Sequence, residues 1–161
     1  MRIMGLDPGS LKTGFGLLDF SNRSFGYVAS GIIRIPAKNS LPERLGVIAE
    51  GVAELIDTYH PDVFAVEDVF FARNPKSALK LGQARGAAIT IAVTRKLPVS
   101  EYEPRLIKQA VAGTGAATKE QIQYMVKSIL KIDGEVKEDA ADALAVAICH
   151  AHLSGTQGVQ N

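Results

Sequence analysis

The first third of the chain alternates short apolar runs with turn signals, which is typical of β-strands. The first run ends at Pro8-Gly9, and a polar segment at 21–24 separates the two runs that follow. Strands joined by such short turns form an antiparallel meander. The expected strands are residues 2–7, 13–20 and 25–35.

Helical spacing of apolar residues begins after this meander. Ser40 and Glu43 match a capping box and predict a helix start, as do Thr118 and Gln121 further along. Asn74, followed by proline, predicts the start of another helix. The expected helices are residues 40–60, 74–95, 103–112, 119–131 and 138–152, with further strands at 63–67 and 98–102.

The order of these elements predicts the fold class. A strand reached through a crossover helix is usually parallel to its neighbour, so the last two strands should extend the meander as parallel strands. We therefore expect an α/β protein with a mixed five-stranded sheet flanked by helices, which is the order of the ribonuclease H-like fold. Residues 1–153 should form a single domain, and 154–161 a short polar C-terminal tail.

Composition narrows the class of protein without naming a function. The 161 residues are 47% hydrophobic, which is enough for a folded core. The sequence has no apolar run of about 18 residues and no signal-peptide pattern at its start. Its single cysteine, Cys149, cannot form an internal disulfide. These features predict a cytoplasmic protein.

The net charge of +1 hides an uneven distribution of charge. Residues 73–137 contain 12 Lys and Arg against 5 Asp and Glu, whereas the segments on either side are each net acidic. A basic middle segment beside acidic ones suits a protein that holds a polyanion near a metal site. The same block could equally be an ordinary solvated face.

Two acidic residues end predicted strands. Asp7 precedes the Pro8-Gly9 turn, and Glu67 ends the fourth strand. If these strands are parallel neighbours, both carboxylates meet at the carboxyl edge of the sheet, where open α/β sheets bind ligands. Asp7 could instead bond its own turn, and Glu67 could simply be a polar strand end. Asp68 would point to the opposite face, so Glu67 is preferred and Asp68 is kept in reserve.

Asp139 and Asp142 lie three residues apart in the last helix and therefore share a face. An acid at a helix start commonly serves as a cap, which is an alternative for Asp139. Asp142 lies within small apolar residues, where an unpaired charge is costly. Four carboxylates from separate elements suit Mg²⁺, a hard ion that prefers oxygen ligands. A pair of such ions can activate water and stabilise the leaving oxygen in phosphodiester cleavage.

Five motifs together resemble the bacterial RuvC family of crossover-junction endodeoxyribonucleases. They occur in the family's order, and the resemblance extends from residue 1 to about residue 152. The motifs are Leu6-Asp7-Pro8-Gly9-Ser10, Thr13-Gly14-Phe15-Gly16, Ala65-Val66-Glu67-Asp68-Val69-Phe70-Phe71, Ser77-Ala78-Leu79-Lys80-Leu81-Gly82-Gln83-Ala84-Arg85-Gly86 and Asp139-Ala140-Ala141-Asp142-Ala143-Leu144-Ala145.

The resemblance implies a Mg²⁺-dependent nuclease that resolves Holliday (four-way) junctions by paired symmetric nicks in recombination and repair. It implies two Mg²⁺ ions per site, with Mn²⁺ able to substitute. Asp139 matches a position where some members have histidine, so it should be the most replaceable ligand. By resemblance the metal ligands are Asp7, Glu67, Asp139 and Asp142.

The resemblance also implies residues that contact DNA. Phe70 matches the aromatic that opens the junction, and Phe71 is the alternative to it. Lys108 and Lys119 match lysines that bind DNA, and Lys119 also supports cleavage. Each could otherwise be an ordinary surface lysine. Further candidate phosphate contacts are Arg73, Lys76, Lys80 and Arg85.

Two partners follow from the same resemblance. The family acts as a homodimer, which suits a junction that needs two matched cuts, and it works with the branch-migration complex RuvA–RuvB. Small residues such as Gly82 and Gly86 would let a helix approach a second copy, or its own sheet, closely. Preference for thymine at the cut site is a further implication.

Several alternatives remain open from the sequence. An actin-like or sugar-kinase-like phosphotransferase shares the strand-end aspartate, but that class needs two such domains. A non-catalytic junction-binding module would not need all four carboxylates. The segment Cys149-His150-Ala151-His152 is better interpreted as structural than as a metal site, because residues i and i+2 do not share a helix face.

Overall fold

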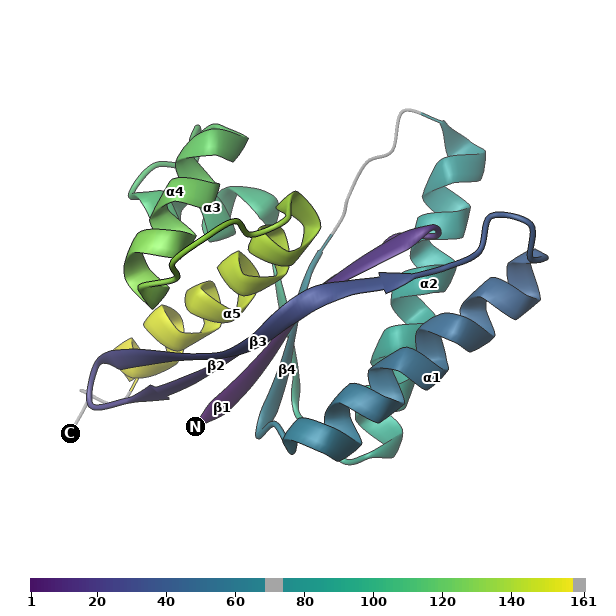
Figure 1. The fold of residues 1–161 in the computed structure, drawn as a ribbon, viewed down its shortest axis with the longest axis horizontal. Coiled ribbons are helices and arrows are strands. Elements are labelled where there is room, and N and C mark those ends of the chain that lie inside the picture. Colours follow the sequence, from purple (N-terminus) through teal and green to yellow (C-terminus); the bar gives the residue numbers. More distant parts are fainter. Residues whose placement is uncertain (69–73, 158–161) are drawn as a thin grey trace.

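A central β-sheet divides the protein into two helical layers (Figure 1). The computed structural model describes residues 1–68 and 74–157. The sheet has five strands in the order β3-β2-β1-β4-β5. Helices α1 and α2 cover one face, and α3, α4 and α5 cover the other. The predicted mixed α/β architecture is therefore confirmed.

The strands pair as the sequence predicts. β1, β2 and β3 form the antiparallel meander. β4 lies parallel beside β1, and β5 lies parallel beside β4. The crossover through α1 returns the chain to the middle of the sheet, which makes β4 the neighbour of β1. The bounds are β1 Arg2–Asp7, β2 Lys12–Ser21, β3 Ser24–Arg34, β4 Val63–Glu67 and β5 Val99–Tyr102.

Side-chain caps set the starts of three helices. Ser40 and Glu43 form the predicted capping box, and so do Thr118 and Gln121. The Asn74 side chain accepts a hydrogen bond from the backbone N–H of Lys76, at 2.9 Å. The bounds are α1 Leu41–Tyr59, α2 Pro75–Thr94, α3 Pro104–Ala112, α4 Lys119–Leu130 and α5 Glu138–Gln157.

Helix α5 continues further than the sequence pattern predicted. We expected it to end at 152, with a polar tail from 154, but it extends to Gln157. Polar residues such as Ser154 do not break a helix once the preceding turns are fixed by packing. In the part of the chain that the structure describes, no helix is both long enough and apolar enough to cross a bilayer.

Consecutive side chains of a strand point to opposite faces of the sheet, so they pack in two separate hydrophobic clusters. Ile3 packs with the cluster beneath α3, α4 and α5, whereas Met4 and Leu6 pack with the cluster beneath α1 and α2. In β4, Val63 and Ala65 face the α5 side. Because the period is two, Asp7 and Glu67 also belong to the α5 face of the sheet.

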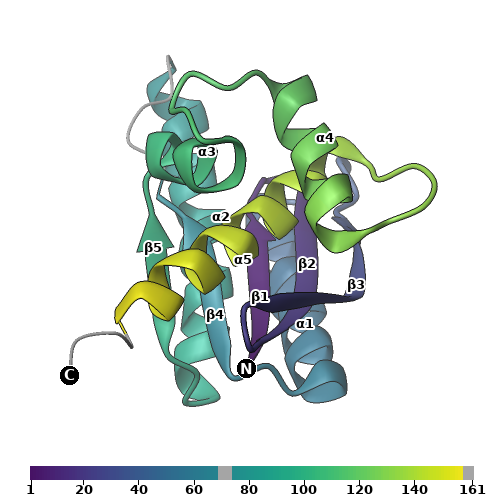
Figure 2. The ribbon, with the colours of Figure 1, turned by 90° about the vertical axis from the view of Figure 1, so that its left-hand side faces the viewer.

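Helix α5 lies directly on glycines of the two central antiparallel strands (Figure 2). Gly5 and Gly16 are partners in the β1–β2 ladder. A Cβ atom at Gly5 would lie 2.0 Å from the carbonyl oxygen of Ala143, and one at Gly16 would lie 2.6 Å from the Leu144 side chain. The absent side chains therefore let the α5 backbone rest on the sheet.

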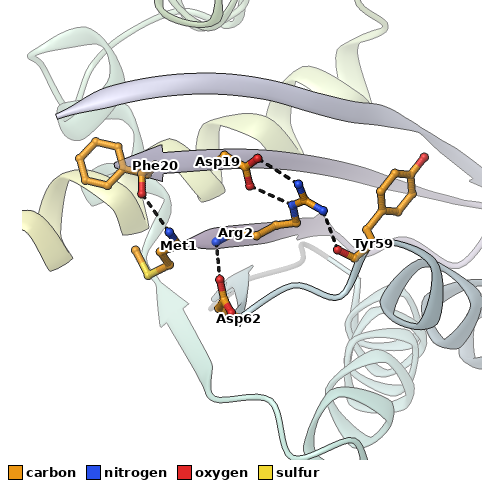
Figure 3. Close-up of polar contacts among 6 residues, drawn as sticks. All are labelled: Met1, Arg2, Asp19, Phe20, Tyr59 and Asp62. Carbon is orange, nitrogen blue, oxygen red and sulfur yellow. Dashed lines mark hydrogen bonds and ion pairs between the residues drawn. The ribbon is translucent and has the colours of Figure 1, made fainter. Parts of the chain in front are cut away.

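The opposite end of β1 is held by polar contacts (Figure 3). The Arg2 guanidinium donates two hydrogen bonds to the Asp19 carboxylate, at 2.8 and 3.0 Å, and one to the Tyr59 carbonyl at 2.9 Å. The Arg2 backbone N–H donates to Asp62. These contacts join β1, β2 and the end of α1 far from Asp7, and so fix the register that places Asp7 opposite Gly14.

We predict that Gly5→Ala destabilises the protein, because the new methyl group would meet backbone on α5 that cannot rotate away. The free energy of unfolding should fall by about 1–3 kcal/mol or more, measured by urea unfolding. Gly46→Ala on α1 is the control, because nothing lies within 4 Å of its added Cβ. That variant should be more stable by about 0.5–1 kcal/mol. Equal stability of the Gly5 variant and the wild type would contradict the close contact with α5.

Candidate active site

The carboxyl ends of β1 and β4 bring two acidic residues together. Leu6 of β1 is the register partner of Val66 of β4, so Asp7 and Glu67 follow side by side at the same edge. Both side chains are half-buried on the face covered by α5. The predicted meeting of these two carboxylates is therefore what the strand pairing produces.

Asp68 takes the opposite direction from Glu67. Its side chain lies 3.6 Å from the guanidinium of Arg85 on α2, on the other face of the sheet. Arg85 also donates a hydrogen bond from Nε to the Glu67 carbonyl oxygen at 3.1 Å. The preference for Glu67 over Asp68 agrees with this geometry. The interpretation of Arg85 as a phosphate contact does not, because its side chain turns inward and is 18% exposed.

Helix α5 supplies the other two carboxylates. A Cβ at Gly14 would lie 2.0 Å from the Asp139 carbonyl oxygen, and Gly14 is the ladder partner of Asp7. The first turn of α5 is therefore set directly beside the end of β1. Asp142 follows one turn later and is half-buried. The i,i+3 spacing then directs both acids toward the sheet edge.

The charges of these acids act on one another. Burial, together with the charges of Asp142, Glu67 and Asp139, raises the pKa of Asp7 to about 8, while the Lys119 ammonium opposes the rise. Burial also raises the pKa of Glu67, with Asp142 adding to it. The pKa of Asp142 rises mainly through burial as well. Such mutual repulsion in a half-buried cluster is a feature of functional sites.

The hydrogen bonds of the turn after β1 test the alternative that Asp7 bonds its own turn. The turn after β1 is held by Thr13, whose hydroxyl donates to the Gly9 carbonyl at 3.1 Å and accepts from the Gly9 N–H at 3.3 Å. Among the described residues, no hydrogen bond or ion pair reaches the side chains of Asp7, Glu67, Asp139 or Asp142. These carboxylates thus neither close turns nor cap helices there.

Two lysines border the cluster. Lys108 of α3 and Lys119 of α4 line a pocket of about 290 Å³ together with Glu67 and Asp142. Lys119 also forms an ion pair with Glu138, the first residue of α5. The positive charge of Lys108 opposes the rise in the pKa of Glu67, and both lysines oppose the rise in the pKa of Asp142. The rest of the wall consists of Pro104, Ile107, Ile122, Ala145 and Val146.

The donor set fits a hard divalent cation that is shared with a substrate. Every donor is a carboxylate oxygen, and the acids repel one another, a cost that a cation would relieve. Within residues 1–68 and 74–157, no three His, Cys, Asp or Glu side chains are arranged to enclose an ion by themselves. Mg²⁺ is usually held by one or two carboxylates plus waters and substrate phosphate, so an open arrangement suits it.

Other predicted residues lie elsewhere or outside the described part. Lys76 and Lys80 are exposed on the first turns of α2 and do not line the pocket. Phe70, Phe71 and Arg73 lie outside the described residues.

The Cys-His-Ala-His segment is used in packing. His150 Nδ1 lies 2.7 Å from the Tyr102 hydroxyl, and His152 Nδ1 lies 2.9 Å from the Ala110 carbonyl oxygen. Burial raises the pKa of the Cys149 thiol to about 12. The three side chains therefore have separate surroundings rather than one common centre.

Sequence reasoning missed the roles of three residues in this region. Glu138 pairs with Lys119, Thr13 holds the turn beside Asp7, and Arg85 supports the backbone of Glu67. Glu138 could have been noticed from its i,i+4 spacing to Asp142. The roles of Thr13 and Arg85 depend on contacts between distant segments and leave no local signal.

Comparison with known proteins agrees with this geometry. Residues 3–150 match the family model described as crossover junction endodeoxyribonuclease RuvC. A protein of that name from Saccharophagus degradans is 55% identical over 154 residues, covering 96% of this chain and 89% of the relative. One from Photobacterium profundum is 57% identical over 154 residues, covering 96% and 88%.

Solved structures give the same result. Thermus thermophilus RuvC in complex with Holliday junction substrate has a TM-score of 0.92 and 33% identity, covering 98% of this chain and 96% of that one. The yeast mitochondrial Holliday junction resolvase has a TM-score of 0.70 at 14% identity and covers 97% of this chain and 80% of its own, which shows a shared fold alone. The chain therefore belongs to the RuvC family of crossover junction endodeoxyribonucleases.

Proposed function

We propose that this protein resolves Holliday junctions by hydrolysing one phosphodiester bond in each of two opposed strands. The observation that carries the proposal is the meeting of Asp7, Glu67, Asp139 and Asp142 at one sheet edge, in a chain that belongs to a nuclease family. The solved relative bound to a Holliday junction supports the choice of substrate. No observation favours the phosphotransferase or the non-catalytic alternative.

The four carboxylates are the proposed ligands of two Mg²⁺ ions, for which Mn²⁺ can substitute. Membership of the family implies a divalent metal cofactor. When bound, the ions would supply activation of water and charge neutralisation at the scissile phosphate. The chain's own part is to hold the acids close despite their repulsion. Among the four proposed ligands, Asp139 should tolerate substitution best, as the resemblance implies.

Several cations are proposed to hold DNA around this centre. Lys108 and Lys119 border the carboxylates and would contact the phosphates on either side of the cut, with Lys119 also supporting cleavage. Arg73 and Lys76 are proposed as further phosphate contacts, and Phe70 as the residue that stacks on an unpaired base.

We further propose that the protein acts as a homodimer through α2. Leu79, Gly82, Gly86 and Val93 lie at spacings of three, four and seven along one side of this helix. Leu79 is 67% exposed and Val93 57%, and the space around both glycines is open. An apolar helix face with glycines between its large side chains suits close approach of a second copy across a two-fold axis.

Three proposals complete this account. Residues 1–153 act as one nuclease domain, with the short segment from 154 lying outside the site. The enzyme works in the cytoplasm, and it works with the branch-migration complex RuvA–RuvB. All three follow from the family resemblance and from the composition of the chain.

The first test is cleavage of a synthetic four-way junction with Mg²⁺. We expect wild type to nick paired strands, and Asp7→Asn to cut at least about 100-fold more slowly while binding the junction as well as wild type, because loss of a ligand should cost at least as much as loss of its supporting shell. Asp57→Asn, an exposed acid paired with Arg95, is the control and should cut normally. A wild type that never cuts, or an active Asp7 variant, would refute the proposed site.

A second prediction concerns pH in the absence of divalent ions. The unfolded Asp7 side chain loses its proton near its ordinary pKa of 3.8, whereas the folded side chain keeps it to about pH 8. The folded state therefore binds more protons in this window, and stability falls as the pH rises. Relative to wild type, Asp7→Asn should gain at most about 1.4 kcal/mol per pH unit between about pH 5 and pH 8.

The measurement is urea unfolding in EDTA at several pH values. Asp57→Asn is the matched control. Arg95 lowers the pKa of Asp57, so this variant should not gain stability relative to wild type as the pH rises. Added Mg²⁺ should stabilise wild type more than Asp7→Asn at the upper end of the range, because the ion binds the ionised carboxylates. A stability difference between Asp7→Asn and wild type that did not change with pH would contradict the buried, repelled carboxylate.

A third prediction tests the proposed dimer. Leu79→Glu places a charge in the exposed apolar face of α2 and should weaken association at least about tenfold, or roughly 1.4 kcal/mol, in sedimentation equilibrium. Tyr124→Glu on α4 is the control, because Tyr124 is 71% exposed on a different helix. If Tyr124→Glu weakened association and Leu79→Glu did not, the interface would lie elsewhere.

A further inference from the structure

The peptide unit between Glu67 and Asp68 is held from both sides. Its carbonyl oxygen accepts a hydrogen bond from Arg85 Nε at 3.1 Å, and its N–H donates to the Tyr102 carbonyl on β5 at 2.8 Å. This peptide unit is the first one after the Cα atom of Glu67. Holding this planar unit in place restrains the main chain at Glu67, and with it the point from which the Glu67 side chain projects.

Arg85 is built into this position. It stands on α2, one helical position after the fully buried Ala84, and its side chain is 18% exposed. Its Nη2 is buried and lies 2.9 Å from Glu101 Oε1 and 3.6 Å from Asp68 Oδ1, although neither contact has the alignment of a hydrogen bond. Two carboxylates therefore hold the guanidinium while its Nε reaches the backbone of β4.

The contact crosses the sheet edge from the face that is not catalytic. Glu67 points to the α5 face, whereas Asp68 and Arg85 lie on the α2 face. Arg85 therefore cannot contact a phosphate at the carboxylates without leaving its partners. It can act on the site only through the main chain.

We propose that Arg85 is a positioning residue that holds Glu67 in the orientation needed to bind the metal. The proposal rests on the assignment of Glu67 as a metal ligand. A planar guanidinium suits the task, since it can donate to a carbonyl from one edge and face carboxylates from another, which a lysine cannot reproduce. Loosening this support lets the Glu67 carboxylate swing away from its neighbours and weakens metal binding before it affects DNA binding.

The test compares Arg85→Gln and Arg85→Lys with the control Arg95→Gln. Arg95 directly follows the last residue of α2 and forms an exposed ion pair with Asp57. Arg95→Gln therefore removes an arginine–carboxylate pair that lies away from the site. Junction affinity is measured in EDTA, and the cleavage rate at saturating junction is measured over a range of Mg²⁺ concentrations. Exchange of the Asp68 amide proton, followed by NMR without metal, reports the backbone directly.

For Arg85→Gln we expect junction affinity within about twofold of wild type and a cleavage rate about 10–100-fold lower, as is typical for loss of a residue that supports a ligand. The Mg²⁺ concentration for half-maximal rate should rise, and the Asp68 amide should exchange at least about tenfold faster. Arg85→Lys should restore part of the rate, because one donor remains. Arg95→Gln should match wild type in every measurement.

Three outcomes would overturn the proposal. A loss of affinity with a shallower salt dependence would make Arg85 a DNA contact instead. Unchanged cleavage would remove any positioning role. If Glu101→Gln, which leaves the hydrogen bond to the Glu67 carbonyl in place, slowed cleavage as much as Arg85→Gln, the role would be a general ion pair. Glu67→Gln distinguishes the proposed metal site from the proposed role of Arg85. If the Glu67→Gln variant were active, Glu67 would not be a required metal ligand, whatever Arg85 does.

Discussion

The contact between α5 and the glycines of β1 and β2 is the constraint on which the site depends. Gly5, Gly14 and Gly16 have no side chain, so the α5 backbone reaches the sheet surface. Side chains at these three positions would hold α5 further from the sheet and carry its acids away from the strand ends. At Gly14 the first turn of α5 instead meets the residue paired with Asp7. Backbone sterics therefore decide where the acids of α5 meet those of the strand ends.

This close approach has an electrostatic cost. Burial and mutual repulsion among the four acids raise the pKa of Asp7 to about 8, and Lys119 offsets only part of that rise. Lys108 likewise opposes the rise in the pKa of Glu67. A fold selected for stability alone would separate these charges. Such a cluster in a well-packed domain suits the proposed metal site, because a bound cation would remove the repulsion that the folded chain tolerates.

At the carboxyl end of β4, the two faces of the sheet carry different kinds of contact. Alternation at the end of β4 sends Glu67 toward α5 and Asp68 toward α2. One face thus carries the candidate carboxylates, and on the other face Arg85 contacts the main chain of β4. Tyr102 of β5 joins both sides, since its carbonyl accepts from Asp68 and its hydroxyl contacts His150 on α5. The ends of β4 and β5 are therefore held by contacts from both helical layers.

The sequence alone predicted the elements, their order and four candidate carboxylates, because apolar periodicity, capping boxes such as Ser40 with Glu43, and short motifs are local signals. The continuation of α5 to Gln157 was not predicted, because the polar residues after Leu153 do not continue the apolar spacing of the helix. Only the tertiary structure decided that Arg85 turns inward, toward Glu101 and the Glu67 carbonyl. The reason is physical: the contacts of Arg85 join β4, β5 and α2, and no local pattern encodes which distant segments will meet.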